Sequence, residues 1–274
     1  MKDDVERRRV AAQSQPVGIF DSGVGGLSVL HEMRRELPNE HFLYVADSGC
    51  APYGDRSADF VSMRAVAITG FLIEQGAKAV VVACNTATAA AAAALRARFD
   101  IPIVAIEPAV KPAASRTRSH VVGVLVTTGM SSSPKLERLV ANYGADVECI
   151  VQPCPGLADR VERGDLDSEE TRMLVARYVR PLVDKGADIL VLGCTHYPFL
   201  RSVIRDVTGP DVEIIDPAQP VARELRRRLD VAGLLASRDQ VGTERFWTTA
   251  AVDDSAGIVR QLWGERVELQ QLAR

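Results

Sequence analysis

Residues 76–86 read GAKAVVVACNT, and residues 186–196 read GADILVLGCTH. Both segments begin with Gly-Ala, continue through a short apolar run and reach a cysteine at the same position. Short runs of this kind, bounded by glycine and rich in aliphatic residues, are typical of strands buried between two helix layers. We therefore expect two equivalent strands that each end near a thiol, Cys84 in the first and Cys194 in the second.

The rest of the chain alternates similar apolar runs with longer helix-like segments. The pattern predicts strands at residues 17–20, 42–46, 79–83, 103–106, 121–126, 147–151, 189–192 and 212–215. Helical patterns lie between them, for example at residues 59–75, 86–99 and 169–185. Strands that alternate with helices form parallel sheets. The predicted fold class is therefore α/β.

The repeat extends beyond the two cysteines. Residues 106–109 (IEPA) match residues 215–218 (IDPA), and residues 17–20 (VGIF) match residues 122–125 (VGVL). Matches in the same order predict an internal duplication that yields two similar parallel-sheet α/β domains. We expect residues 1–15 to form a flexible N-terminal tail, residues 16–108 plus 218–274 the first domain, and residues 109–217 the second. Because ligands of such sheets bind at the carboxyl ends of the strands, the active site is expected in the cleft between the domains.

Composition excludes several classes of function. The chain has 274 residues and a formal net charge of −3, without the clustered positive charge of a generic nucleic-acid binder. It has no apolar run long enough to span a membrane, and its polar first 15 residues are no secretory signal. The five cysteines are therefore expected to be reduced thiols in the cytoplasm, and their spacing does not suggest a metal site.

The two cysteine motifs have both structural and chemical interpretations. An unpaired cysteine is usually a small buried apolar residue. A thiol at a strand end and a helix N-terminus, however, feels the positive end of the helix, which stabilises a thiolate. After Cys84, Asn85 and Thr86 can cap the helix or contact a ligand. Near Cys194, we expect His196 to have the usual histidine pKa near neutral pH, so that it can hold or move a proton, or it can be structural.

Three other segments are candidates for the same site. Residues 21–26 (DSGVGG) follow the first strand and lack the dinucleotide-binding pattern, but their amides can hold a carboxylate or a phosphate. The alternative is an ordinary turn with Asp21 and Ser22 as caps. Residues 47–54 can likewise be a simple turn. Glu162, on a predicted helix, can be a solvated charge.

Four motifs together resemble those of the bacterial glutamate racemase family, within the aspartate/glutamate racemase superfamily. They are DSGVGG at residues 21–26, APYG at 51–54, ACNT at 83–86 and GCTHYP at 193–198. The similarity extends from about residue 16 to residue 229. The resemblance implies interconversion of L- and D-glutamate without pyridoxal phosphate, any other cofactor or a metal. It also implies that the D-glutamate supplies peptidoglycan synthesis, and so cell-wall biogenesis and cell shape.

The resemblance also implies residue roles. Cys84 would remove the α-proton of D-glutamate and Cys194 that of L-glutamate, and the opposite thiol would return a proton. Asp21 would assist Cys84, and His196 with Glu162 would assist Cys194. Substrate contacts would come from Asp21, Ser22, Tyr53, Gly54, Asn85, Thr86, Thr127, Thr195 and His196.

Other functions remain open at this point. The same scaffold can carry an aspartate racemase or another amino-acid racemase. A non-catalytic regulatory member of the family that restrains DNA gyrase and a redox-active dithiol are further alternatives. We expect the protein to be a cytoplasmic homodimer whose partner is a small molecule, glutamate. We expect it to bind neither a membrane nor, directly, a nucleic acid.

Overall fold

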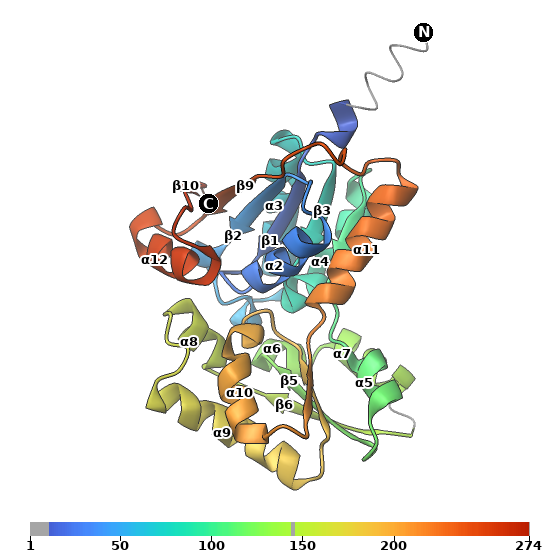
Figure 1. The fold of residues 1–274 in the computed structure, drawn as a ribbon, viewed down its shortest axis with the longest axis vertical. Helices are drawn as coiled ribbons and strands as arrows, with labels where there is room; N and C mark the ends of the chain where they lie inside the picture. The colour runs from blue at the N-terminus through green and yellow to red at the C-terminus, as the bar shows by residue number, and fades with distance from the viewer. Residues whose placement is uncertain (1–10, 144–145, 274) are drawn as a thin grey trace.

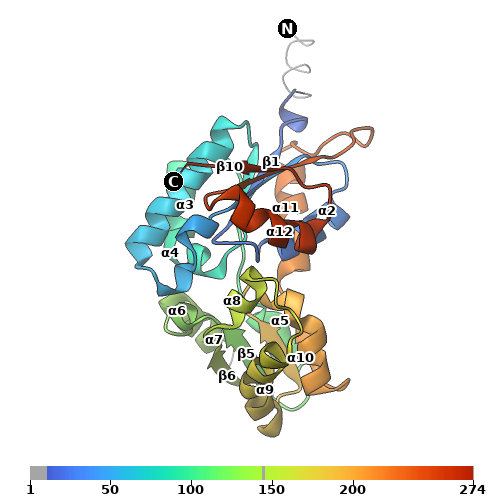
Figure 2. The ribbon, with the colours of Figure 1, turned by 90° about the vertical axis from the view of Figure 1, so that its left-hand side faces the viewer.

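The computed structural model describes residues 11–143 and 146–273. The chain forms two α/β lobes that lie one above the other in both views (Figures 1 and 2). Most of the predicted flexible tail, residues 1–10, lies outside the described residues, and residues 11–13 form a helical turn. In the described part of the chain, we find no helix with the length and apolar character needed to cross a membrane.

The first lobe contains a six-stranded parallel sheet in the order β10-β9-β2-β1-β3-β4. Its strands are β1 (Val17–Asp21), β2 (Phe42–Ala46), β3 (Ala79–Val82), β4 (Ile103–Ala105), β9 (Glu244–Thr248) and β10 (Leu269–Gln271). The last two come from the C-terminal segment, which returns to the first sheet and pairs with β2 through β9.

The second lobe contains a four-stranded parallel sheet in the order β6-β5-β7-β8. Its strands are β5 (Val121–Val126), β6 (Glu148–Pro153), β7 (Ile189–Leu192) and β8 (Glu213–Ile215). The eight predicted strands are confirmed, with differences of one or two residues at their ends. The order β2-β1-β3-β4 in the first lobe matches β6-β5-β7-β8 in the second, as a duplication requires. The duplication and the domain limits at residues 108 and 218 remain predictions.

Helices cover both faces of each sheet, as the apolar runs of the strands require. In the first lobe, Ile19 packs into the cluster formed with α2 and α11, while its neighbour Phe20 packs against α3 and α4. The helices of this lobe are α2 (Leu27–Glu36), α3 (Ala58–Glu74), α4 (Asn85–Arg98), α11 (Ala218–Val231) and α12 (Val252–Trp263), with 3₁₀ turns η1 (Ser48–Cys50) and η2 (Tyr53–Asp55).

The second lobe follows the same plan. Val124 packs in the cluster with α5 and α7, and Leu125 packs in the cluster with α8, α9 and α10. The helices are α5 (Val110–Arg116), α6 (Thr128–Ser131), α7 (Pro134–Tyr143), α8 (Leu157–Glu162), α9 (Glu169–Asp184) and α10 (Arg201–Thr208), with the 3₁₀ turn η3 (Tyr197–Leu200). The predicted helices are confirmed at α3, α4 and α9.

The arrangement of the lobes determines where a site can form. The strands β1, β3 and β7 end at Asp21, Val82 and Leu192, and the predicted functional motifs follow these ends. Figure 2 shows α6 and α8 on the side of the second lobe that faces the first. The loops after the strands therefore meet between the two sheets.

Candidate active site

The two predicted thiols line one small cavity, although they belong to different lobes. Cys84 follows β3 and is the N-cap residue of α4, whereas Cys194 follows β7. Their relative exposures are only 5% and 7%. The cavity has a volume of about 30 Å³. Two titratable groups, one from each lobe, therefore meet at one enclosed place.

The cavity gathers most of the residues that the sequence motifs indicated. Its lining is Ser22, Pro52, Tyr53, Gly54, Cys84, Asn85, Thr86, Thr127, Gly193, Cys194, Thr195 and His196. The predicted residues Asp21 and Glu162 lie behind this lining, where they contact Thr195 and His196. Pro52 and Gly193 were not singled out, although both lie inside the motifs that carried the resemblance.

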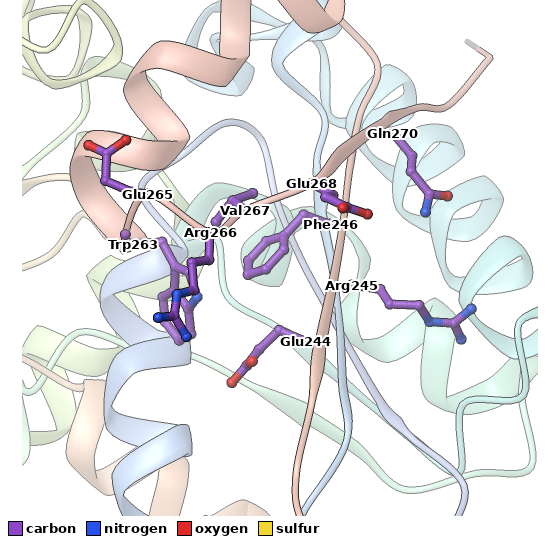
Figure 3. Close-up of a pocket in the computed structure, with 10 residues that line it drawn as sticks. Glu244, Arg245, Phe246, Trp263, Glu265, Arg266, Val267, Glu268 and Gln270 are labelled. Carbon is purple, nitrogen blue, oxygen red and sulfur yellow. The ribbon is translucent and has the colours of Figure 1, made fainter.

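A roomier hollow of about 470 Å³ lies elsewhere, between the end of α12 and strands β9 and β10. Figure 3 shows the aromatic rings of Phe246 and Trp263 there, among charged side chains such as Arg245, Arg266 and Glu265. None of the predicted site residues lines this hollow. It contains neither of the two thiols, so the smaller cavity is the candidate active site.

A chain of polar contacts leads away from Cys194. Its Sγ lies 3.6 Å from Nδ1 of His196, and Nε2 of the same ring lies 2.5 Å from Oε1 of Glu162. Burial lowers the pKa of His196, but the charges and hydrogen bonds of Cys194 and Glu162 outweigh burial and hold this pKa well above the ordinary value of 6.5. The imidazole is therefore protonated near neutral pH and donates toward the sulfur.

The surroundings of Cys84 are different. The main-chain N–H of Ala87 donates to Sγ of Cys84 over 3.4 Å, and the thiol donates to Oγ of Ser22 over 3.7 Å. We expected the start of the helix to favour a thiolate here. The contact with Ala87 acts in that direction, but burial and the charge of Asp21 raise the pKa of Cys84 strongly. Cys84 is therefore held as a thiol.

The expectation that both cysteines lie at a helix N-terminus is wrong for Cys194. Cys84 directly caps α4, whereas Cys194 is followed by His196 and the 3₁₀ turn η3 before α10 begins at Arg201. The group beside Cys194 is thus a histidine side chain, whereas the group beside Cys84 is the N-terminus of α4. The two halves share a strand and a thiol but not the group that acts on the thiol.

Asp21 is fully buried at the end of β1. Its Oδ2 accepts hydrogen bonds from the main-chain N–H of Gly26 at 2.8 Å and from Oγ1 of Thr195 at 3.3 Å. Burial raises the pKa of Asp21, although the charge of His196 opposes this. Asp21 makes no hydrogen bond with Cys84 among the described residues, so its influence on this thiol is electrostatic.

The glycines of residues 21–26 permit a close approach between the lobes. The main-chain N–H of Val24 donates to Oε1 of Glu162 over 2.8 Å. A Cβ atom at Gly23 would lie 1.9 Å from the same oxygen, and one at Gly25 would lie 2.3 Å from Nδ1 of His196. Any side chain at Gly23 or Gly25 would displace Glu162 or His196. Only glycine, which has no side chain, therefore fits at these two positions.

Some polar atoms around the cavity have no partner in the described part of the protein. They are Oδ1 and Nδ2 of Asn85 and Oγ1 of Thr127. A buried polar atom without a hydrogen bond costs free energy, so a polar ligand in the cavity would satisfy them. Over residues 11–143 and 146–273, no group of three or more His, Cys, Asp or Glu residues is arranged to hold a metal ion.

Comparisons with known proteins agree on one family. The family model described as Asp/Glu/Hydantoin racemase matches residues 20–225. The chain is 51% identical over 254 residues to the glutamate racemase of Methylococcus capsulatus, covering 93% of this chain and 94% of that protein. This likeness extends over both lobes.

Solved structures give the same result. A glutamate racemase isoform from Bacillus anthracis superposes with a TM-score of 0.85 and 35% identity, covering 95% of this chain and 98% of that one. The glutamate racemase of Escherichia coli, in complex with L-glutamate and the activator UDP-MurNAc-Ala, has a TM-score of 0.83 and 31% identity, covering 94% and 98%.

Proposed function

The chain belongs to the Asp/Glu/Hydantoin racemase family, and on this basis we propose that it interconverts L- and D-glutamate by proton transfer through Cys84 and Cys194. Membership of the family makes the chain a racemase. Its substrate, glutamate, and the mechanism with two thiols are what we propose. The meeting of two buried thiols from opposite lobes at one cavity carries it. A racemase has to remove a proton from one face of the α-carbon and return one to the other face, which two such groups can do.

The surroundings of the two thiols suit different steps of this reaction, proton removal at one thiol and proton delivery at the other. Cys84 is held as a thiol, the form that donates a proton. Cys194 faces the protonated imidazole of His196, which stabilises the sulfur when it carries a negative charge. This state fits removal of the α-proton of L-glutamate by Cys194 and delivery of a proton by Cys84. The reverse reaction starts from the opposite protonation state of the pair.

Stabilisation of the carbanion is the harder part of the chemistry. An amino-acid α-proton is very weakly acidic, so donors have to be aimed at the charge that develops when it leaves. Asn85 and Thr127 offer unpaired donors at the cavity. The hydroxyl of Thr195 lies beside them, but it already donates to Asp21. Since these groups are buried, their interactions with the substrate act in a medium of low polarity and are stronger than in water.

The cavity has to widen before the substrate binds. A space of about 30 Å³ accommodates only a few water molecules. It is closed partly by a contact between the lobes, where the carbonyl of Gly54 lies so close to Gly129 that a Cβ on Gly129 would be 2.1 Å from this oxygen. We propose that the lobes move apart there to admit glutamate and close again to exclude water.

The decisive experiment follows optical rotation or circular dichroism of L-glutamate with the purified protein and no added cofactor. The signal should decay to zero, and an equal concentration of L-aspartate should change far more slowly. Cys84→Ser and Cys194→Ser should each lose racemisation, with Cys149→Ser, a half-buried thiol outside the cavity, as the matched control. Aspartate racemisation faster than that of glutamate would support the aspartate alternative instead.

The biological setting is a further part of the proposal. The resemblance to glutamate racemases supports a supply of D-glutamate for peptidoglycan, a cytoplasmic location and a homodimer. Sedimentation of the purified protein tests the dimer. Loss of growth that external D-glutamate restores, after depletion of the protein, tests the supply role.

A further inference from the structure

We propose that Asp47, held by Arg64 and Thr249, is a positioning residue that fixes Tyr53 and, through it, the wall of the cavity at residues 52–54. This inference rests on the proposed racemase function. It adds to that function three residues, Asp47, Arg64 and Thr249, that do not line the cavity. Only Asp47 lies in a candidate segment of the sequence, residues 47–54, where a simple turn also explains it.

The carboxylate of Asp47 is fully buried and makes hydrogen bonds with both oxygens. Its Oδ2 accepts from the hydroxyl of Tyr53 at 2.5 Å and from Nε of Arg64 at 3.0 Å. Its Oδ1 accepts from Nη2 of Arg64 at 2.8 Å and from Oγ1 of Thr249 at 2.7 Å. These four bonds compensate the loss of hydration, and a buried carboxylate is tolerated only under that condition.

The arrangement fixes how Tyr53 is used. Tyr53 lines the cavity, yet its hydroxyl donates to Asp47 instead of to the cavity. Burial and the charge of Asp47 raise the pKa of Tyr53, so the hydroxyl keeps the proton that it donates. The substrate can therefore meet the main chain or the ring of Tyr53, while the hydroxyl serves as an anchor.

The hydrogen bond between Tyr53 and Asp47 also affects the contact between the two lobes. Gly54 follows Tyr53 directly, and its carbonyl forms the close contact with Gly129 of the other lobe. A shift of Tyr53 would therefore change both the width of the cavity and the contact that closes it.

Thr249 connects this wall to the C-terminal part of the chain. It directly follows β9, and its main-chain N–H donates to the carbonyl of Ala46 over 3.1 Å. Its Oγ1 both donates to Asp47 and accepts from the main-chain N–H of Gly49 at 3.1 Å. One hydroxyl thus links the end of β9 to the loop that carries Tyr53.

The test compares two threonine variants in the full-length protein. Thr249→Val removes the hydroxyl at almost constant volume, and Thr249→Ser keeps it. Thr208→Val is the matched control, since Thr208 is a similarly buried threonine at the end of α10, away from the cavity. KM and kcat are measured with L- and D-glutamate, and Tm is measured for each variant.

We expect Thr249→Val to raise KM about tenfold for both isomers and to change kcat about twofold or less, because a lost wall contact weakens binding throughout the reaction. Thr249→Ser should restore KM to within about twofold of the wild-type value. A purely structural role predicts instead that Thr249→Val and Thr208→Val lower Tm alike and leave KM unchanged, which would overturn the proposal.

Tyr53→Phe provides an independent measurement if Thr249→Val does not fold. It keeps the ring and removes only the hydroxyl, so KM should again rise about tenfold. An unchanged KM would overturn the anchoring role while leaving the racemase function intact. A wild-type protein that does not racemise glutamate would overturn the proposed function, and the positioning role with it.

Discussion

Oε1 of Glu162 lies 2.5 Å from Nε2 of His196, at the point where the two lobes meet. The same oxygen accepts the main-chain N–H of Val24 from the first lobe, at 2.8 Å. Glu162 and His196 belong to the second lobe, as does Cys194. The group that acts on Cys194 is thus held partly by the opposite lobe, and its geometry depends on the closure of the cleft.

Glu162→Gln should slow racemisation because it removes a charge that supports protonated His196. We expect kcat/KM to fall about a hundredfold, the lower end of the effect of a positioned acid–base group. The two isomers have equal free energies, so kcat/KM must fall by the same factor in both directions. Glu170→Gln, whose parent side chain is 75% exposed, is the control and should keep wild-type kinetics. Unequal losses in the two directions would indicate an error in the assay, and no loss would exclude Glu162 from the mechanism.

Gly25→Ala should impair catalysis more than folding. The new Cβ would lie 2.3 Å from Nδ1 of His196, so the ring or the loop has to move. Because a displacement of about 1 Å at a reaction centre can cost a hundredfold in rate, kcat/KM should fall by about that factor. Steady-state kinetics of the purified variant checks this.

Gly70→Ala is the matched control for that change. Gly70 lies inside α3, and a Cβ there would have no atom within 4 Å. Alanine favours the helix interior over glycine by up to about 1 kcal/mol, so the free energy of unfolding should rise slightly while activity is unchanged. Equal activity of the Gly25 and Gly70 variants would contradict the role of the close approach.

The stability of the protein should depend on pH through His196. Its pKa in the folded state lies well above the ordinary value of 6.5. Proton binding therefore favours the folded state fully below about pH 6.5, and this benefit is lost as the pH rises through the folded pKa. The difference in free energy of unfolding between wild type and His196→Asn should shrink as the pH rises above about 6.5. Urea unfolding at a series of pH values measures it, and a difference that grows with pH would contradict the assignment.

The positions of the strands along the chain could be predicted from the sequence because buried parallel strands are short aliphatic runs. Residues 76–86 and 186–196 showed this pattern twice, and each pattern placed a cysteine at a carboxyl end. The site motifs could also be predicted, because parallel strands all end at one edge of their sheet and ligands bind at that edge. The structure then placed Ser22, Asn85 and Thr195 around one cavity.

Other features required three-dimensional distances. The expectation of a thiolate at Cys84 considered the helix end but not the burial of the thiol, which dominates its pKa. Thr249 lies 202 positions from Asp47, and Asp47, Arg64 and Thr249 each have an ordinary local explanation as a turn, helix or strand-end residue. Only the folded chain shows that Arg64 and Thr249 both bind the carboxylate of Asp47.

The most direct test of two opposing thiols follows deuterium during racemisation in D₂O. The protein is incubated with L-glutamate, and the reaction is stopped at low conversion. With two groups on opposite faces, the D-glutamate formed should carry deuterium at the α-carbon, and the remaining L-glutamate should stay unlabelled. The same should hold for the reverse reaction. Deuterium that enters the remaining L-glutamate as fast as it enters D-glutamate would show one group serving both faces, which would contradict the proposed mechanism.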